Sequence, residues 1–152
     1  MLLQMAEYYA SIHKFLREDP ILLKLMGIEY PAAFTDEGFL SLASVRIQKR
    51  KKPQSLNIEN MPLISFYNNP GFHGANPLEY LFSFNFDIYS NDDVEWALLI
   101  SDHITKKFEE QDAGLRCCLL KGQWMAGGEC ETDQLNTYKY FTQILFTLIL
   151  NK

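Results

Sequence analysis

The chain has 152 residues, of which 47% are hydrophobic and 22% are charged. Nineteen acidic residues outnumber fourteen basic ones and give a formal net charge of −5 at pH 7. This composition is too apolar for an intrinsically disordered protein and too acidic for a dedicated nucleic-acid binder. No uncharged apolar run approaches the roughly 18 residues of a membrane span, and the first residues lack the basic start of a secretory signal. We therefore expect a soluble protein with one domain over residues 1–152 and no membrane partner.

The N-terminal segment has the pattern of an amphipathic helix followed by a short second helix. Apolar side chains recur at three- and four-residue steps through residues 5–16, with polar ones between them. Asp19 followed by Pro20 is typical of an N-cap and a first helical residue. The second helix is expected to cover residues 21–26 and to stop at Gly27.

The next segments are expected to be strands. In residues 38–48 the pattern changes to a period of two, which predicts a strand, although both faces have mixed polarity. Residues 61–67 form a second short apolar run with Pro62 near its start, a position that suits the beginning of a strand or a sheet edge. Residues 68–77 contain two turn signals, one at Pro70-Gly71 and one at Asn76-Pro77, and are expected to form a loop.

The clearest strand covers residues 79–89, where one face is almost entirely aromatic and the other mostly polar. Such an alternation is typical of a sheet with one buried and one solvated face. Ser90 begins a capping-box pattern, so a helix is expected over residues 92–110, with Gly114 ending it. The residues of the aromatic face are Tyr80, Phe82, Phe84, Phe86 and Ile88.

The C-terminal part is expected to form two strands, over residues 115–125 and 137–150, with a turn at Gly127-Gly128. At about 3.3 Å per residue the last strand would span about 46 Å, which is long for a small domain. We therefore expect it to bend or to pair, as an edge strand, partly with another chain. The element order predicts an α+β fold: a single antiparallel or mixed β-sheet with helices packed mainly on one face.

Motifs of catalysis and metal binding are absent from the sequence. The histidines do not have metal-ligand spacing, and there is no phosphate-binding glycine loop or nucleophile elbow. His103 follows Asp102 on the expected helix and is interpreted as a residue of its rim, and His73 as an exposed loop residue. We expect no catalytic residue, no cofactor and no metal. The histidines are His13, His73 and His103.

The cysteines and a short acidic stretch have plain interpretations. The three cysteines are expected to be free thiols, because an odd number that includes an adjacent pair does not indicate a disulfide framework. The acidic residues after Gly128 lack the spacing of a calcium loop and are interpreted as a solvated hairpin turn. These two groups are Cys117, Cys118 and Cys130, and Glu129, Glu131 and Asp133.

One electrostatic feature stands out. Five of the fourteen basic residues lie within seven positions, and the remainder of the chain has nine bases against nineteen acids, a net charge of −10. A solvated hairpin tip is one interpretation. The other gives the cluster an anionic partner: the acidic body of a neighbouring copy or, as an alternative, nucleic acid. The candidate partner-binding residues are Arg46, Lys49, Arg50, Lys51 and Lys52.

The order of these segments resembles the tail-terminator, or tail-completion, proteins of long-tailed bacteriophages, which lie at the head–tail junction. The resemblance implies a mixed sheet flanked by helices and a six-membered ring. The ring would cap the tail tube, stop its polymerisation and join the tail to the head. The segments that carry the resemblance are residues 12–16, 19–23, 62–67, 86–90, 92–110, 132–133 and 138–150.

By this resemblance, residues 46–60 occupy the place of a flexible loop that orders on assembly. The implied partners are other copies of the chain, the tail tube protein and a head–tail connector protein, with DNA only as cargo passing through the lumen. The implied location is the virion tail, after assembly in the host cytoplasm. Two alternatives stay open: another head–tail connector component, such as a head-closure protein, and a small cytoplasmic domain that binds a ligand beneath Phe82, Phe84 and Phe86. An enzyme ranks behind both.

Overall fold

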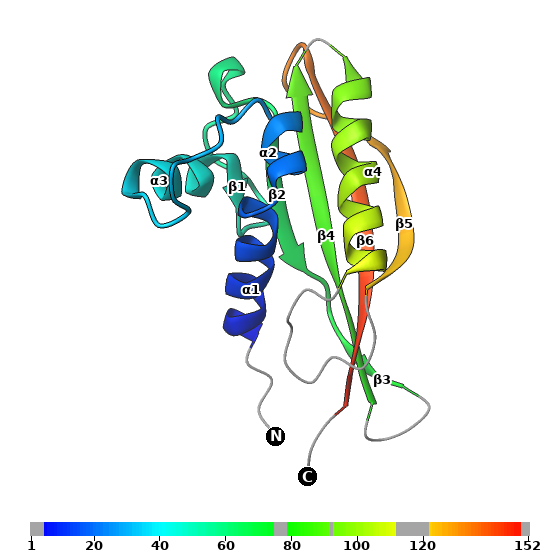
Figure 1. The fold of residues 1–152 in the computed structure, drawn as a ribbon. Helices are drawn as coiled ribbons and strands as arrows, with labels where there is room; N and C mark the ends of the chain where they lie inside the picture. The colour runs from blue at the N-terminus through cyan, green and yellow to red at the C-terminus, as the bar shows by residue number, and fades with distance from the viewer. Residues whose placement is uncertain (1–4, 75–78, 92, 112–121, 150–152) are drawn as a thin grey trace.

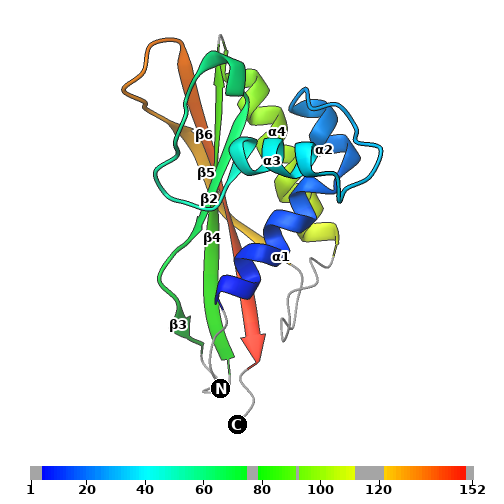
Figure 2. The same cartoon turned by 90° about the vertical axis from the view of Figure 1, so that its left-hand side faces the viewer.

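The computed structural model describes residues 5–74, 79–91, 93–111 and 122–149. Its sheet has the strand order β1-β2-β4-β6-β5, and β3 pairs with β4 beside this path. The α-helices lie together on one face of the sheet (Figures 1 and 2). The helices are α1 (Met5–Arg17), α2 (Pro20–Leu25), α3 (Glu37–Arg46), the 3-10 turn η1 (Ile58–Asn60) and α4 (Val94–Glu110). The strands are β1 (Ile47–Gln48), β2 (Leu63–Asn68), β3 (Phe72–His73), β4 (Glu79–Asn91), β5 (Gln123–Cys130) and β6 (Thr137–Ile149).

The sheet is mixed, and the expected α+β fold class is confirmed. Strands β1 and β2 run parallel, whereas all other pairs are antiparallel. The longest pair is β4 with β6, whose register runs from Glu79 opposite Ile149 to Asn91 opposite Thr137. The prediction of a long final strand is confirmed, but its expected position at an edge is wrong. Strand β6 lies inside the sheet, because β4 pairs with its whole length and β5 with residues 139–145 on its other side.

The aromatic face of β4 forms the centre of the core, as its period of two predicts. Phe82, Phe84 and Phe86 are each at most 1% exposed and pack against rings of α1, β2, α4 and β6. Each such ring contributes about 2–3 kcal/mol by its burial. The three rings are core residues whose faces are occupied by other rings, so they do not line the ligand pocket that was considered beneath this strand.

The two N-terminal helices form where the sequence predicts them. The Asp19 carboxylate accepts a hydrogen bond of 3.0 Å from the Ile21 amide and caps α2, with Pro20 as the first helical residue. After α2 the chain turns at Gly27, whose φ of +70° lies in the left-handed region that glycine adopts without strain. The first helix buries Ile12 and Leu16 completely against the core.

The strand expected over residues 38–48 is wrong for most of its length. Residues Glu37–Arg46 form α3, and only Ile47–Gln48 are extended. The Asp36 carboxylate caps α3 by accepting a hydrogen bond of 2.9 Å from the Phe39 amide. The helix then buries Phe39 and Ala43, a spacing of four that the period-two pattern had hidden.

Three local boundaries also differ from expectation. Strand β4 extends through Asn91, and the N-cap of α4 is Asp93 rather than Ser90. Within the segment expected to be a loop, Phe72–His73 pair with β4 as β3. Gly127 and Gly128 lie inside β5, and the β5–β6 turn comes later, at residues 131–136. The first part of the expected strand 115–125, and Gly114, lie outside the described residues.

The other face of the sheet, which we call the outer face, has both polar and apolar side chains and is crossed by one loop. Leu56 of this loop packs against a second apolar cluster of Met61, Leu63 and Tyr89. The chain from β1 to β2, residues 49–62, passes across this face, and the β5–β6 hairpin projects on the same side (Figure 2). Gln134 of the hairpin donates a hydrogen bond of 2.7 Å to the Leu56 carbonyl of the loop. The basic cluster and the acidic hairpin therefore lie on the same side of the protein. No described helix is long and apolar enough to cross a membrane.

Candidate functional site

Arg46, the first of the five basic candidates, is a buried structural residue. It is 7% exposed at the end of α3. Its Nε donates a hydrogen bond of 3.0 Å to the Pro62 carbonyl, and Nη2 donates one of 2.5 Å to the Met26 carbonyl. These bonds connect α3 with the end of α2 and the start of β2. The guanidinium therefore faces the interior, and a partner could reach only the other four bases.

Lys49, Arg50, Lys51 and Lys52 are exposed on the loop that crosses the outer face. Two contacts fix this loop to the sheet. The Ser65 hydroxyl of β2 donates a hydrogen bond to the Arg50 carbonyl, and the ammonium group of Lys51 lies 5.5 Å from the centre of a tyrosine ring of β2. The backbone of the basic segment thus has a defined path, while its charged groups face outward. Their role in binding a partner stays a prediction.

Gln48 holds the two ends of the basic segment together. Its side-chain amide donates hydrogen bonds of 2.9 Å to the Val45 carbonyl and 2.8 Å to the Gln54 carbonyl. Its side-chain oxygen accepts a bond of 2.9 Å from the Gln54 amide. The glutamine is 8% exposed, so these three bonds satisfy a buried amide. They also place Lys49 and Arg50 at the rim of a hollow.

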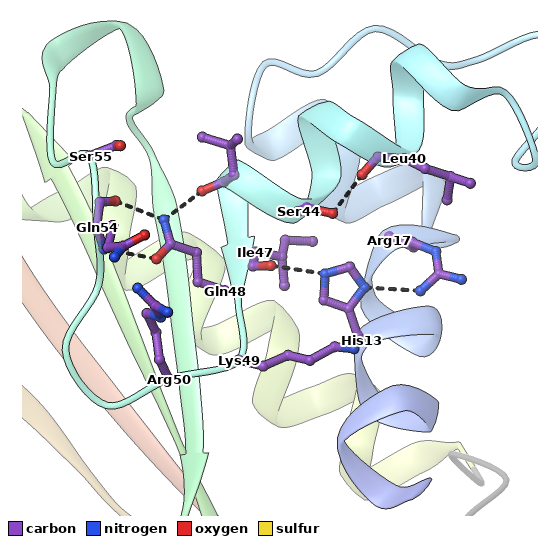
Figure 3. A pocket seen from close by; sticks show the side chains of 11 residues that line it. His13, Arg17, Leu40, Ser44, Ile47, Gln48, Lys49, Arg50, Gln54 and Ser55 are labelled. Atoms are coloured by element: carbon purple, nitrogen blue, oxygen red, sulfur yellow. Dashed lines mark hydrogen bonds between the residues drawn. The ribbon is translucent and has the colours of Figure 1, made fainter. Parts of the chain in front are cut away.

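This hollow, which we call the basic hollow, has a volume of about 520 Å³ and lies between α1, α3, β1 and the loop (Figure 3). Arg17, Lys49 and Arg50 contribute three cations, and no carboxylate lines it. The side chains of Leu40 and Val45 add an apolar wall. The other lining residues are His13, Ser44, Ile47, Gln48, Gln54 and Ser55.

His13 forms the neutral floor of the basic hollow. Burial lowers the pKa of its imidazole to about 4, and the positive charges of Arg17 and Lys49 act in the same direction. The neutral ring donates from Nε2 to the Ile47 carbonyl at 2.8 Å and accepts at Nδ1 from Arg17 Nη1 at 2.9 Å. Desolvation is the main cause of the low pKa, and the charges of Arg17 and Lys49 add a smaller positive field. A field of this sign favours an anion.

Arg17 has an unused donor at this site. Its Nη1 is bonded to His13, but its buried Nε has no hydrogen-bond partner. A buried N–H without a partner costs about 1–3 kcal/mol. Within the described residues, Arg17, Lys49 and Arg50 form no ion pair with a carboxylate. The geometry therefore supports binding of an anion, whereas no nucleophile and base are paired here for catalysis.

The β5–β6 hairpin has the opposite charge. A second hollow of about 420 Å³ at its base contains Glu129 and Glu131 and no basic residue. Asp133 is exposed nearby, and Leu135 at the turn is 91% exposed. Within the described part of the chain, no group of three or more histidine, cysteine or acidic residues could hold a metal ion. The prediction of a solvated acidic hairpin is confirmed, with its turn at residues 131–136.

Asp87 of β4 is a buried carboxylate on the outer face. It is 1% exposed; Lys139 Nζ of β6 lies 3.4 Å from Oδ2, which accepts no hydrogen bond. Burial raises the pKa of Asp87 by more than the charge of Lys139 lowers it. Burial alone would lower the pKa of Lys139, but the charges of Asp87 and Tyr89 raise it. Asp87 and Lys139 lie on neighbouring strands of one chain and compensate each other's charge. The pair therefore does not indicate a ligand site.

The remaining candidate residues have structural positions or fall outside the description. His103 pairs with Asp19 rather than with its neighbour Asp102. The side chain of His73 and both adjacent cysteines, Cys117 and Cys118, lie outside the described residues. The one cysteine whose surroundings are described, Cys130, is free.

Known proteins are similar to this chain in fold rather than in sequence. No protein-family model matches it, and no curated protein matches its sequence. Among solved structures, its fold is similar to that of a chain in "Virion of native gene transfer agent (GTA) particle". The TM-score is 0.60, the alignment covers 93% of each chain, and the sequence identity is 10%. The two chains share a fold.

The sequence did not reveal the basic hollow as a site. Its cations come from α1 and from the loop after β1, which lie about 35 residues apart and meet only because α1 packs beside β1. One local signal was present: His13 and Arg17 are four residues apart on a helix and therefore share a face. Nothing in the sequence indicated that Gln48 and Gln54 would close the loop.

Proposed function

We propose that this protein is a structural component of a phage-like virion, located in the tail at the head–tail junction. The observation that carries the proposal is the fold similarity to a virion chain, which extends over 93% of both chains. The sequence supports it independently, since its order of segments resembles the tail-terminator family. Within the described residues, the polar clusters are a hollow lined by three cations, an acidic hairpin and internal ion pairs, which fits a protein that acts by contact.

In the proposed role, copies of the chain form a ring, six-membered by the resemblance, at the end of the tail tube. The ring stops tube polymerisation and joins the tail to the head connector. The charge distribution supports contact between copies, since each has exposed bases at residues 49–52 and an acidic hairpin at residues 129–133. We assign these charges to subunit contacts rather than to the lumen, because a lumen that conducts DNA should not bind it tightly.

Light scattering coupled to size-exclusion chromatography tests this proposal. A ring predicts a species near six times the chain mass of 17.7 kDa, and negative-stain images of that species with a central opening. The purified species, added to polymerising tube protein from the same phage, should shorten the tubes. A chain that stays monomeric at millimolar concentration in low and high salt would contradict the proposal. Ring formation without any effect on tubes would favour the head-closure alternative.

A further inference from the structure

The basic hollow is a pocket whose cations are not neutralised by its own walls. Its three cations have no carboxylate among the lining residues, and the Arg17 Nε–H points to no acceptor. Its wall also offers apolar surface, since Val45 is 37% exposed. A matching ligand therefore combines carboxylates with an apolar side chain. A volume of about 520 Å³ lies within the usual range of small ligand pockets.

The β5–β6 hairpin has this combination. Glu131 and Asp133 are exposed and form no ion pair with a described residue. Leu135 follows them at the turn and, at 91%, is the most exposed large hydrophobic residue described. An exposed leucine beside two unpaired carboxylates is complementary to an apolar wall beside unpaired cations.

We infer that the acidic hairpin of one copy, residues 131–135, binds in the basic hollow of the next copy. This inference rests on the proposed ring and names its contact. Glu131 and Asp133 face Lys49, Arg50 and the guanidinium of Arg17, and Leu135 packs on Leu40 and Val45. Hairpin and hollow are different surfaces of one chain, so the contact is head-to-tail, the type that closes into a ring.

Charge reversal tests the contact from both sides. The hollow variant is Lys49→Glu with Arg50→Glu, and the hairpin variant is Glu131→Lys with Asp133→Lys. Each should raise the dissociation constant of the assembly by about tenfold or more, because like charges then face each other. The two variants mixed in equal amounts should assemble again, since every contact in an alternating ring is then complementary. Lys24→Glu with Lys106→Glu, exposed bases away from the hollow, is the charge-matched control and should assemble normally.

A covalent trap gives a second readout. In a chain whose three native cysteines are replaced by serine, Val45→Cys with Leu135→Cys should yield disulfide-linked multimers on non-reducing gels, whereas each single variant should not. If the wild-type chain assembles but neither reversal weakens it, or the mixture does not recover, the inferred contact is wrong and the proposed ring survives. If the hollow variant loses only affinity for duplex DNA while its assembly is unchanged, the hollow binds phosphate and the inference also fails. A wild-type chain that stays monomeric would overturn both the inference and the proposed function.

Discussion

His103 Nε2 lies 2.6 Å from Asp19 Oδ2, although 84 residues separate them in the chain. Lys107 Nζ lies 3.4 Å from the same oxygen. The other carboxylate oxygen, Oδ1, caps α2 through the Ile21 amide. Asp19 therefore joins the start of α2 to one face of α4. Burial would raise the pKa of this carboxyl, but the hydrogen bond and charge of His103 and the charge of Lys107 lower it overall.

Replacing Asp19 should destabilise the fold. Asp19→Ala removes a helix cap and leaves His103 and Lys107 of α4 without their acceptor, so we expect a loss of about 3 kcal/mol in the free energy of unfolding. Urea unfolding followed by the fluorescence of Trp96, whose indole donates to the Leu25 carbonyl, measures this loss. The control is Asp102→Asn on the exposed face of α4, which should cost less than about 0.5 kcal/mol. Equal effects of the two substitutions would contradict the assignment.

His13 should make stability depend on pH. Its pKa is about 4 in the folded protein and 6.5 in the unfolded chain, so the unfolded state binds a proton more readily between these values. Stability from the neutral ring is complete above pH 6.5 and is lost as the pH falls towards 4, by up to about 3 kcal/mol. His13→Gln keeps a donor for the Ile47 carbonyl. In this variant the urea midpoint should depend less on pH between 6.5 and 4. If the urea midpoint of the variant depends on pH as strongly as that of the wild-type chain, the pKa assigned to His13 is wrong.

Substitutions of Arg46 and Arg50 should affect stability differently, because Arg46 is buried and Arg50 is exposed. Arg46→Ala leaves the Met26 and Pro62 carbonyls without their donor, and we expect a loss of about 2–4 kcal/mol in unfolding free energy. Arg50→Ala removes an exposed side chain and should change stability by less than about 0.5 kcal/mol. In the assembly assay the order should reverse, so that Arg50→Ala weakens association in a fully folded chain. Similar stability of both variants would mean that Arg46 is as solvated as its neighbour.

Neutralising the buried carboxylate of Asp87 should cost little free energy of unfolding. Since burial raises its pKa despite the nearby Lys139, the folded state takes up this proton more readily than the unfolded chain. Asp87→Asn should therefore change stability at pH 7 by less than about 1 kcal/mol, because the Lys139 side chain is 24% exposed and keeps contact with water when its partner is neutral. As the pH falls from neutral towards 4, the wild-type chain should gain stability relative to this variant. Paired urea titrations measure the difference, and a relative loss by the wild-type chain would reverse the assigned sign.

Alternation in a strand and capping residues at a helix end predicted the corresponding parts of the fold correctly, because each depends only on neighbouring residues. The alternation of residues 79–89 specifies which face of β4 carries the aromatic core, because neighbouring side chains of a strand point to opposite sides. Likewise, Asp19-Pro20 and Gly27 delimit α2, since capping and a positive φ are properties of a few adjacent residues. The expectation that the other face of β4 is solvated is wrong in part, because Ser83, Asp87 and Tyr89 on that face are buried as well. The segment at residues 37–46 was misread because its apolar residues fit either period, and the burial of Phe39 and Ala43 against other elements decided for the helix.

Only the tertiary structure decided what the charged residues do. The sequence by itself determined that five bases lie close together in an acidic chain, and that an acidic hairpin precedes the last strand. It could not separate Arg46, which faces two backbone carbonyls, from Arg50, which faces solvent. Nor could it place Arg17 beside Lys49, because that contact requires α1 and β1 to pack side by side. The physical reason is that burial and electrostatic field depend on all neighbours in space, whereas a sequence pattern reports only neighbours along the chain.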